Sequence, residues 1–377
     1  LNLNTCRFLW KQVKFPTATD ASNTTAQVLK QGEVQGSDVA AHSAGVLDIK
    51  TTILPDADAL FLTAIDRYGH ELWRWTFPVN KLNQANEVLS PLSNKVTSTE
   101  TENELTVKAK NHTFIFSKKD GQLKGVSVNN HKISFANGPR FIGARRADRS
   151  LDQFYNHDDE KAKEKDRTYS EFPDAAVFTK LDVKEDGGNL IVTANYKLGN
   201  LDKAQWTINP SGEAVLDYTY NFSGVVDLMG VYFDYPEDRV ISKRWLGAGP
   251  YRVWQNRIHG TQYDVWENDY NDPIPGETFT YPEFKGYFGS VSWMNIRTKE
   301  GTISLTNETP DAYIGVYQPR DGRDRLLYTL PESGISVLNV IPPVRNKVNS
   351  TDLCGPSSQP KWVNGPQSGR IIFRFME

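Results

Sequence analysis

Residues 57–79 read ADALFLTAIDRYGHELWRWTFPV, and their pattern indicates how the chain folds. Two apolar runs flank the polar, turn-forming segment DRYGHE, which is the pattern of a β-hairpin. In the second run Trp73, Trp75 and Phe77 alternate with polar residues, a period of two. Successive side chains of a strand point to opposite faces of its sheet. The segment is therefore predicted to be a hairpin with one buried face.

The same alternation recurs along the chain. Residues 112–128, HTFIFSKKDGQLKGVSV, again place two apolar runs around a turn-forming KDG. Residues 214–224 place four side chains on one face of a strand, namely Leu216, Tyr218, Tyr220 and Phe222. The best helical candidate, residues 157–167, is charged all round and is predicted to be a solvated insertion. Many short strands and almost no helix predict an all-β fold.

A polar stretch divides the chain in two. Residues 80–104 are poor in aromatic residues and contain a Ser-Pro pair, which predicts a domain boundary between residues 80 and 100. Residues 1–92 are about the size of an immunoglobulin-like β-sandwich with an N-terminal linker. Residues 93–377 are large enough for two broad antiparallel sheets packed face to face.

Composition excludes several classes of protein. The 377 residues carry a net charge of −3 without a dense lysine and arginine stripe, so neither nucleic acid nor a membrane is expected as a partner. The GxSxG, P-loop and HExxH motifs and zinc-ligand spacings do not occur, so no cofactor and no metal is expected. Cys6 and Cys354 are predicted to be free thiols, with one disulfide as the alternative.

Residues 229–257 read MGVYFDYPEDRVISKRWLGAGPYRVWQNR and resemble the last domain of β-galactosidase-type enzymes of glycoside hydrolase family 2. The residues that match the motif of that family are Pro236, Trp245, Gly247, Gly249, Pro250 and Arg257. A looser match to a second motif lies in TYPEFKGYFGSVSWM, with Tyr281, Pro282, Glu283 and Gly286. Residues 114–130 match the opening strand pair of the family, and the part before Asn80 is similar to the immunoglobulin-like domain that precedes it.

The resemblance implies a large sandwich of the galactose-mutarotase-like type, also called a supersandwich. Departures from the family pattern are also present. Arg252 and Asn256 stand where the family often carries acidic residues, and residues 138–150 replace its RAPTDND segment. These differences predict a divergent branch whose substrate need not be a β-galactoside.

The resemblance also implies a function. In family 2 the catalytic glutamates lie on a central barrel, which here would precede Leu1. The chain is therefore expected to be the non-catalytic C-terminal portion of a bacterial β-galactosidase-like glycoside hydrolase, periplasmic or secreted. It would support the barrel of the same polypeptide and contact carbohydrate. A free-standing carbohydrate-binding protein is one alternative. A sugar epimerase or polysaccharide lyase that uses His157 is another.

Candidate sugar contacts follow the glycine-containing motif WLGAGP, whose glycines are interpreted as turn residues. Aromatic rings can stack on the C–H face of a sugar while amide and charged groups bind its hydroxyls. The predicted carbohydrate-binding residues are Trp254, Asn256, Arg257, His259 and Trp266. Trp254 and Trp266 are expected to be at least partly exposed, whereas Trp245 is expected to lie in the core. No catalytic residue is assigned.

Overall fold

The computed structural model describes residues 2–20, 25–80, 95–146, 169–172, 174–268, 286–316, 333–343 and 355–377. Within these ranges the paired strands are antiparallel, and the helical elements are three short 3-10 turns: η1 (Leu3–Thr5), η2 (Glu237–Arg239) and η5 (Pro356–Ser358). The prediction of an all-β fold is confirmed. No helix of the described ranges has the length and apolar character needed to cross a membrane.

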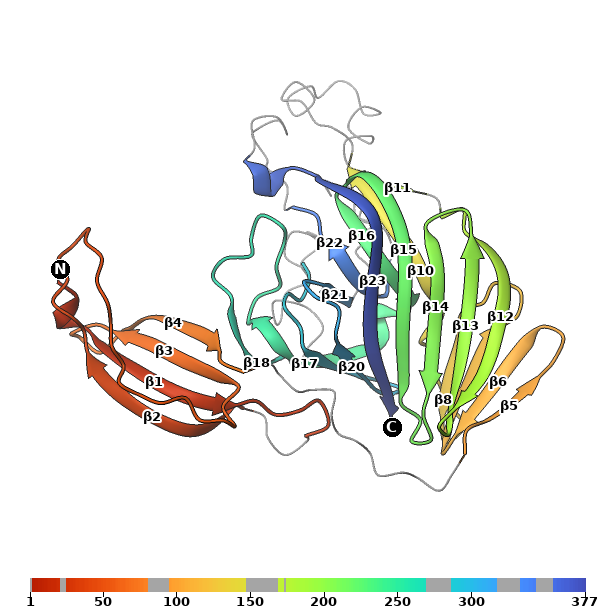
Figure 1. Cartoon of the computed structure of the whole chain (residues 1–377), viewed down its shortest axis with the longest axis horizontal. Coiled ribbons are helices and arrows are strands. Elements are labelled where there is room, and N and C mark those ends of the chain that lie inside the picture. The colour runs from red at the N-terminus through yellow and green to blue at the C-terminus, as the bar shows by residue number, and fades with distance from the viewer. Residues whose placement is uncertain are drawn as a thin grey trace.

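The strands form three sheets (Figure 1). The four-stranded sheet has the order β2 (Gln27–Gln35), β1 (Arg7–Lys14), β3 (Ala59–Ile65) and β4 (Glu71–Pro78). The ten-stranded sheet has the order β21 (Tyr313–Val316), β22 (Ile335–Val340), β16 (Leu228–Asp234), β10 (Ala136–Arg146), β8 (Leu123–Val128), β7 (His112–Ser117), β6 (Glu104–Ala109) and β5 (Thr97–Glu100), with β11 (Tyr169–Glu171) on β10 and β9 (His131–Ile133) on β8. The nine-stranded sheet has the order β12 (Val177–Asp186), β13 (Asn189–Lys197), β14 (Leu201–Ile208), β15 (Ala214–Val226), β23 (Lys361–Met376), β20 (Gly301–Asn307), β19 (Trp293–Thr298), β17 (Val240–Gly249) and β18 (Gln262–Asn268).

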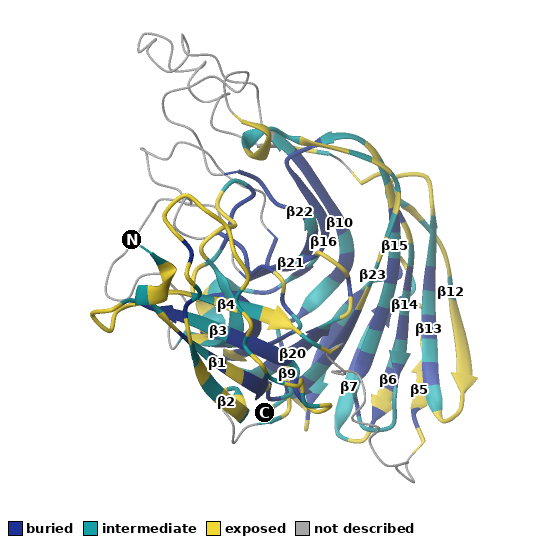
Figure 2. Cartoon of the chain, turned by 60° about the vertical axis from the view of Figure 1, so that its left-hand side comes forward, coloured by how far each residue is buried: buried dark blue, intermediate teal, exposed yellow. Residues whose placement is uncertain are grey.

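The two larger sheets pack face to face around an aromatic core. Trp206 on β14 lies 6.1 Å from Phe116 on β7 and 6.0 Å from Phe233 on β16, measured between ring centroids. Phe373 on β23 lies 5.6 Å from the ring of Phe233. Buried residues alternate with partly exposed ones along the inner strands, as Figure 2 shows for β13 to β15. This period of two is the pattern from which the fold class was predicted.

β23 lies in the middle of the nine-stranded sheet. It pairs with β15 from Val226 to Ala214 on one side and with β20 on the other. Its first half is mostly exposed, whereas Ile371, Phe373 and Phe375 are buried in the core. β23 therefore joins two halves of the sheet that would otherwise not be bonded to each other.

Glu300 connects the two large sheets at one edge. It lies in the turn between β19 and β20, and its carboxylate accepts hydrogen bonds from Ser134 N–H at 2.9 Å, Ser134 Oγ at 2.8 Å and Tyr235 Oη at 3.1 Å. Arg239 in η2 forms an ion pair with the same carboxylate. Burial disfavours the charged carboxylate, but the hydrogen bonds and the charge of Arg239 outweigh this effect and lower the pKa of Glu300.

The predicted hairpin over residues 57–79 is confirmed, because β3 pairs with β4. Asp66 closes its turn by accepting the backbone N–H groups of Tyr68 and His70, both at 2.8 Å. Among the described residues this part of the chain forms one sheet, so the immunoglobulin-like sandwich stays a prediction. The boundary between residues 80 and 100 also stays a prediction.

The expected burial of the second hairpin strand is wrong. Trp73, Trp75 and Phe77 are 38–46% exposed. β4 is the edge of its sheet and has a strand neighbour on one side only. The same face is covered over β1, where the buried Gln12 side chain is hydrogen-bonded to residues 51–54. On β4 the partly buried residues are Arg74 and Thr76, on the face opposite to the predicted one.

The other face of the small sheet packs on the nine-stranded sheet. Val13, Phe15, Phe61 and Ala59 share an apolar cluster with Leu246 and Trp293. Trp293 Nε1 donates a hydrogen bond to Pro16 O at 3.0 Å, and Arg74 forms an ion pair with Asp264 at 3.0 Å. These contacts are both apolar and directional, so they hold the small sheet in one orientation on β17 to β19.

Two substitutions on β23 test the assignment of the core. Phe373→Ala removes a buried ring, and we expect it to lower the free energy of unfolding by about 3–5 kcal/mol. Trp362→Ala removes a ring that is 71% exposed, and we expect a change within about 0.5 kcal/mol. Urea unfolding followed by tryptophan fluorescence and circular dichroism measures both. Equal destabilisation by the two variants would contradict the assignment.

The Glu300 network is expected to make stability depend on pH. The folded pKa of Glu300 lies below that of an unfolded glutamate, about 4.3, so its stabilising effect is present above that pH and is lost as the pH falls through the folded value. We expect Glu300→Gln to lower the melting temperature at pH 7 and to differ less from the wild type near pH 3. Glu185→Gln, at the surface, is the matched control. A gap that is the same at both pH values would contradict this account.

Candidate functional site

The motif that guided the functional prediction lies on β17. Trp245 is fully buried, and its Nε1 donates a hydrogen bond to Ala248 O at 3.0 Å, so its predicted place in the core is confirmed. The glycines of the motif lie within the strand and not in a turn, contrary to the sequence interpretation. A Cβ on Gly249 would lie 2.4 Å from the ring of Trp266, so the glycine permits close approach of that ring.

Trp254 is buried, which contradicts its expected exposure. Its side chain is only 2% exposed and packs edge-on against Tyr287, with 5.5 Å between ring centroids. The backbone of Val253 exchanges hydrogen bonds of 2.7 and 2.9 Å with Tyr287. This pairing places the Trp254 ring in an apolar cluster that includes Ile142 of β10. The polar residues around it in the sequence gave no sign of this pairing.

The other predicted contacts differ in how far they are exposed. Trp266 is half-buried against the main core, and its Nε1 donates to Gly247 O at 3.2 Å and Gln262 O at 3.1 Å. Asn256 is half-buried and donates to Ser358 Oγ at 3.1 Å. Arg257 and His259 are exposed. The loop therefore presents polar groups, while its two tryptophans pack into the protein.

A pocket of about 550 Å³ lies between the two large sheets. β10 pairs with β8 only at Gly138, opposite Leu123, but pairs with β16 from Arg140 to Ala144. Beyond Gly138 the β7–β8 turn is not paired with β10, and the pocket lies between the turn and this strand. Its wall is formed by Lys119, Asp120, Gln122, Arg140, Phe141, Glu171, Phe172, Asp174, Ala176, Phe178, Tyr196, Leu201 and Tyr232.

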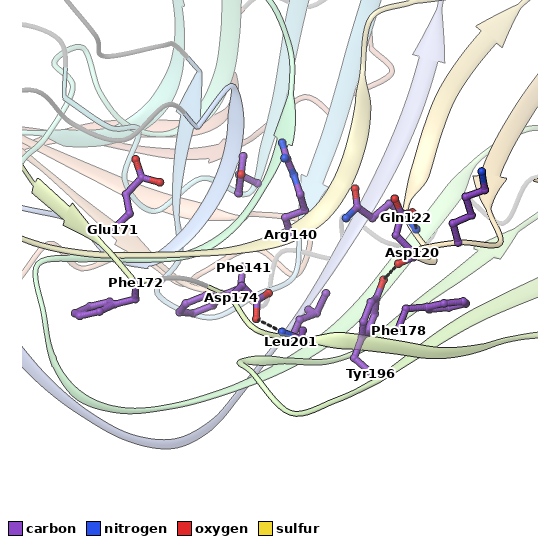
Figure 3. A pocket seen from close by; sticks show the side chains of 13 residues that line it. Asp120, Gln122, Arg140, Phe141, Glu171, Phe172, Asp174, Phe178, Tyr196 and Leu201 are labelled. Carbon is purple, nitrogen blue, oxygen red and sulfur yellow. Dashed lines mark hydrogen bonds between the residues drawn. The ribbon is translucent and has the colours of Figure 1, made fainter.

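Arg140 and Asp120 dominate the polar side of the pocket (Figure 3). Arg140 forms an ion pair with Asp234, and its guanidinium carbon lies 4.4 Å from the ring centroid of Tyr232. Asp120 forms an ion pair with Lys124 at 3.0 Å. Burial disfavours the charged form of Asp120, but hydrogen bonds, above all from Lys124, outweigh burial and lower its pKa. Asp120 is therefore an ionised acceptor at neutral pH.

Aromatic side chains form the apolar side. Phe178 and Tyr196 pack edge to face, with 5.9 Å between ring centroids, and Phe141 lies 5.3 Å from the ring of Tyr220. Tyr196 Oη donates a hydrogen bond to Asp120 O at 2.9 Å. Burial, reinforced by the charge of Asp120, raises the pKa of Tyr196 far above neutral, so this hydroxyl stays protonated.

The titratable groups of the lining include two tyrosines. Tyr196 and Tyr232 both have raised pKa values, mainly because they are buried. Among the lining residues that the structure describes there is no histidine. No group of three or more potential metal ligands occurs within the described ranges. His157, which the epimerase or lyase alternative requires, lies outside them, as does Cys354, while Cys6 is a free thiol. The pocket offers an apolar wall beside several hydrogen-bonding groups.

The sequence missed this pocket because its wall comes from separate segments. Asp120 and Gln122 belong to a turn that was recognised only as part of a hairpin. Arg140 belongs to a segment that stood out only as a departure from the family pattern. A weak signal was the density of charged and aromatic residues around residues 138–150 and 169–178.

Comparison with known proteins gives one family match. A family model described as the beta-galactosidase small chain matches residues 108–341. No curated protein matches the chain.

Solved structures with a similar arrangement include a galactose 1-epimerase from Lactobacillus acidophilus NCFM, with 10% identity, a TM-score of 0.38 and coverage of 75% of this chain and 98% of that one. A putative mutarotase from Salmonella typhimurium has 8% identity and a TM-score of 0.34, covering 75% and 94%. A copper-containing benzylamine oxidase from Hansenula polymorpha has 7% identity and a TM-score of 0.30, covering 99% and 77%.

The burial of Trp254 leads to a stability prediction. Trp254→Ala leaves a cavity beside Tyr287, and we expect it to lower the free energy of unfolding by about 3–5 kcal/mol. His259→Ala, five residues further on and exposed, is expected to change it by less than about 0.5 kcal/mol. Thermal and urea unfolding of both variants measures the difference. If Trp254→Ala were as stable as the wild type, Trp254 would not be buried, and the exposed position predicted from the sequence would be correct.

Proposed function

This chain belongs to the family of the beta-galactosidase small chain, and from this we propose that it is the non-catalytic C-terminal portion of a β-galactosidase-like glycoside hydrolase of family 2. The observation that carries the proposal is the extent of the family match. Residues 108–341 begin in β6 and end just after β22, so the match runs through both large sheets. The proposed role is to support the catalytic barrel and to contact its carbohydrate substrate.

An exposed aromatic surface on β4 supports the proposed barrel contact. Leu72, Trp73, Trp75 and Phe77 are 38–56% exposed on one edge strand. Contiguous exposed apolar side chains of this size are typical of interaction surfaces. The opposite face of the same sheet is fixed to the nine-stranded sheet by the Arg74–Asp264 ion pair. A barrel seated on β4 would therefore be held at a defined distance from the large sandwich.

The proposed substrate contact uses the loop after β17. Arg257 and His259 are exposed there, and Asn256 is half-buried beside Ser358. These side chains can donate hydrogen bonds to sugar hydroxyls. Trp266 is close to this loop in sequence and half-buried, so it remains part of the proposal, whereas the burial of Trp254 leaves its ring no open face. A periplasmic or secreted bacterial location belongs to the same proposal.

A free-standing carbohydrate-binding protein is the second candidate. The polar loop and the pocket fit both candidates, because neither feature needs a barrel in order to bind a sugar. The exposed aromatic surface on β4 separates them: the first candidate requires it to contact a barrel, and the second does not.

The isolated chain is expected to hydrolyse no glycoside. Turnover of aryl β-galactoside, β-glucuronide and α-arabinoside substrates should equal that of buffer, and activity that survives repurification would overturn the proposal. In this proposal another part of the parent polypeptide supplies the barrel. When the barrel and this chain are joined or mixed, we expect glycoside turnover. Replacing both Trp73 and Trp75 with serine should lower that turnover at least tenfold. Arg67→Ser, near the tip of the same hairpin, is the control. A parent polypeptide without a barrel would favour the free-standing protein.

A further inference from the structure

We propose that the pocket between the two large sheets is a saccharide-binding site of its own, which takes a neutral mono- or disaccharide without any residue from a catalytic barrel. It is separate from the loop proposed above to contact the substrate of the barrel. The lining comes entirely from this chain, and its volume of about 550 Å³ lies within the roughly 300–1,000 Å³ of small-molecule sites.

The two sides of the pocket match the two kinds of surface on a sugar ring. Phe172, Phe178, Tyr196 and Leu201 provide apolar surface for the C–H face of a pyranose. Figure 3 shows Glu171 at one end of the pocket and Gln122 at the other, with Arg140 between them. These groups supply acceptors and donors around a ring that lies on the apolar side, which is what hydroxyls on several carbons require.

Arg140 has hydrogen-bonding capacity that the protein does not use. Its Nη2 donates to Asp234, whereas its Nε is buried and has no hydrogen-bond partner among the described residues. A buried donor without a partner is costly, and such groups are uncommon unless a ligand or water satisfies them. The Arg140 side chain is still 33% exposed, so other N–H groups of its guanidinium can donate to a sugar hydroxyl.

The charges of the pocket select against an anionic ligand. The described residues of its lining include three carboxylates, from Asp120, Glu171 and Asp174, and two cations, from Lys119 and Arg140. An ion pair with Asp234 neutralises Arg140, and an ion pair with Lys124 neutralises Asp120. With these partners included, four carboxylates stand against three cations, so a phosphate or carboxylate on the ligand would meet a net negative charge. The site suits an uncharged polyol better than a sugar phosphate or a uronic acid.

The walls are formed before a ligand binds. Asp174 Oδ1 accepts the backbone N–H groups of Ala176 at 3.1 Å and Asn200 at 3.0 Å. Gly121 has φ of 73°, and a Cβ there would lie 2.7 Å from the ring of Phe178, so the turn packs directly on that ring. Pre-formed walls lower the entropic cost of binding. The isolated chain is therefore expected to bind the sugar.

Ligand-observed NMR and calorimetry with the whole chain test this proposal. Galactose, glucose and lactose are the neutral probes, and galactose 1-phosphate and galacturonic acid are the charged ones. We expect at least one neutral sugar to bind and the charged probes to bind at least tenfold more weakly. Arg140→Ala and Gln122→Ala should each weaken binding by about tenfold, the effect of losing one good hydrogen bond to a ligand. Gln122→Ala lies in a turn and leaves no buried charge, so it tests the site even if Arg140→Ala does not fold.

A control variant and a loop variant separate this site from other surfaces. Tyr68→Ala removes a ring that is 70% exposed at the tip of the β3–β4 hairpin, and it should bind sugar as the wild type does. Asn256→Ala alters the loop after β17 that is proposed to contact the substrate of the barrel, so it shows whether sugar bound by the isolated chain lies in that loop instead. Three results would each overturn the proposed saccharide site. They are no binding of any neutral sugar, tighter binding of galactose 1-phosphate than of galactose, and loss of binding in Asn256→Ala but not in Gln122→Ala. Glycoside hydrolysis by the isolated chain would instead overturn the proposed function and leave the pocket standing.

Discussion

Aromatic packing between the two large sheets is the interaction on which the rest of this structure depends. Trp206 contacts Phe116 and Phe233 of the opposite sheet, and Phe373 contacts Phe233 from the same side. Rings of this size bury more area than aliphatic side chains and dominate the energetics of a core. They set the separation of the sheets, and so they set the room that is left between the β7–β8 turn and β10.

The pocket exists because the ten-stranded sheet is incompletely paired between β8 and β10, in its middle. Gly138 is the one residue of β10 in register with β8, and a Cβ on it would lie 2.2 Å from the ring of Phe233. The glycine thus lets a core ring reach the strand at the point where the sheet opens. Gly138 therefore serves both the packing of the core and the formation of the pocket. A larger side chain at this position would disturb the contact with Phe233 and the opening between β8 and β10.

The sequence predicted the parts of the structure that depend on local pattern. Period two gave the all-β fold, the hairpin over residues 57–79 and the shared face of β15, where Leu216, Tyr218 and Tyr220 are buried and Phe222 is half-buried. The burial of Trp245 was also predicted correctly. Which strand faces solvent depends on neighbours distant in sequence, and so the exposure of Trp75 and the burial of Trp254 were both predicted wrongly. The pocket was missed for the same reason, since Arg140 and Tyr196 meet only in three dimensions.

The position of β23 has a consequence for biosynthesis. Translation proceeds from the N-terminus at about 5–20 residues per second, and β23 leaves the ribosome after both of its neighbours in the sheet, β15 and β20. Until then β15 and β20 keep unpaired inner edges, which are templates for pairing with other chains. The nine-stranded sheet can therefore close only after β23 emerges. Such late, long-range closure makes folding slow and sensitive to concentration.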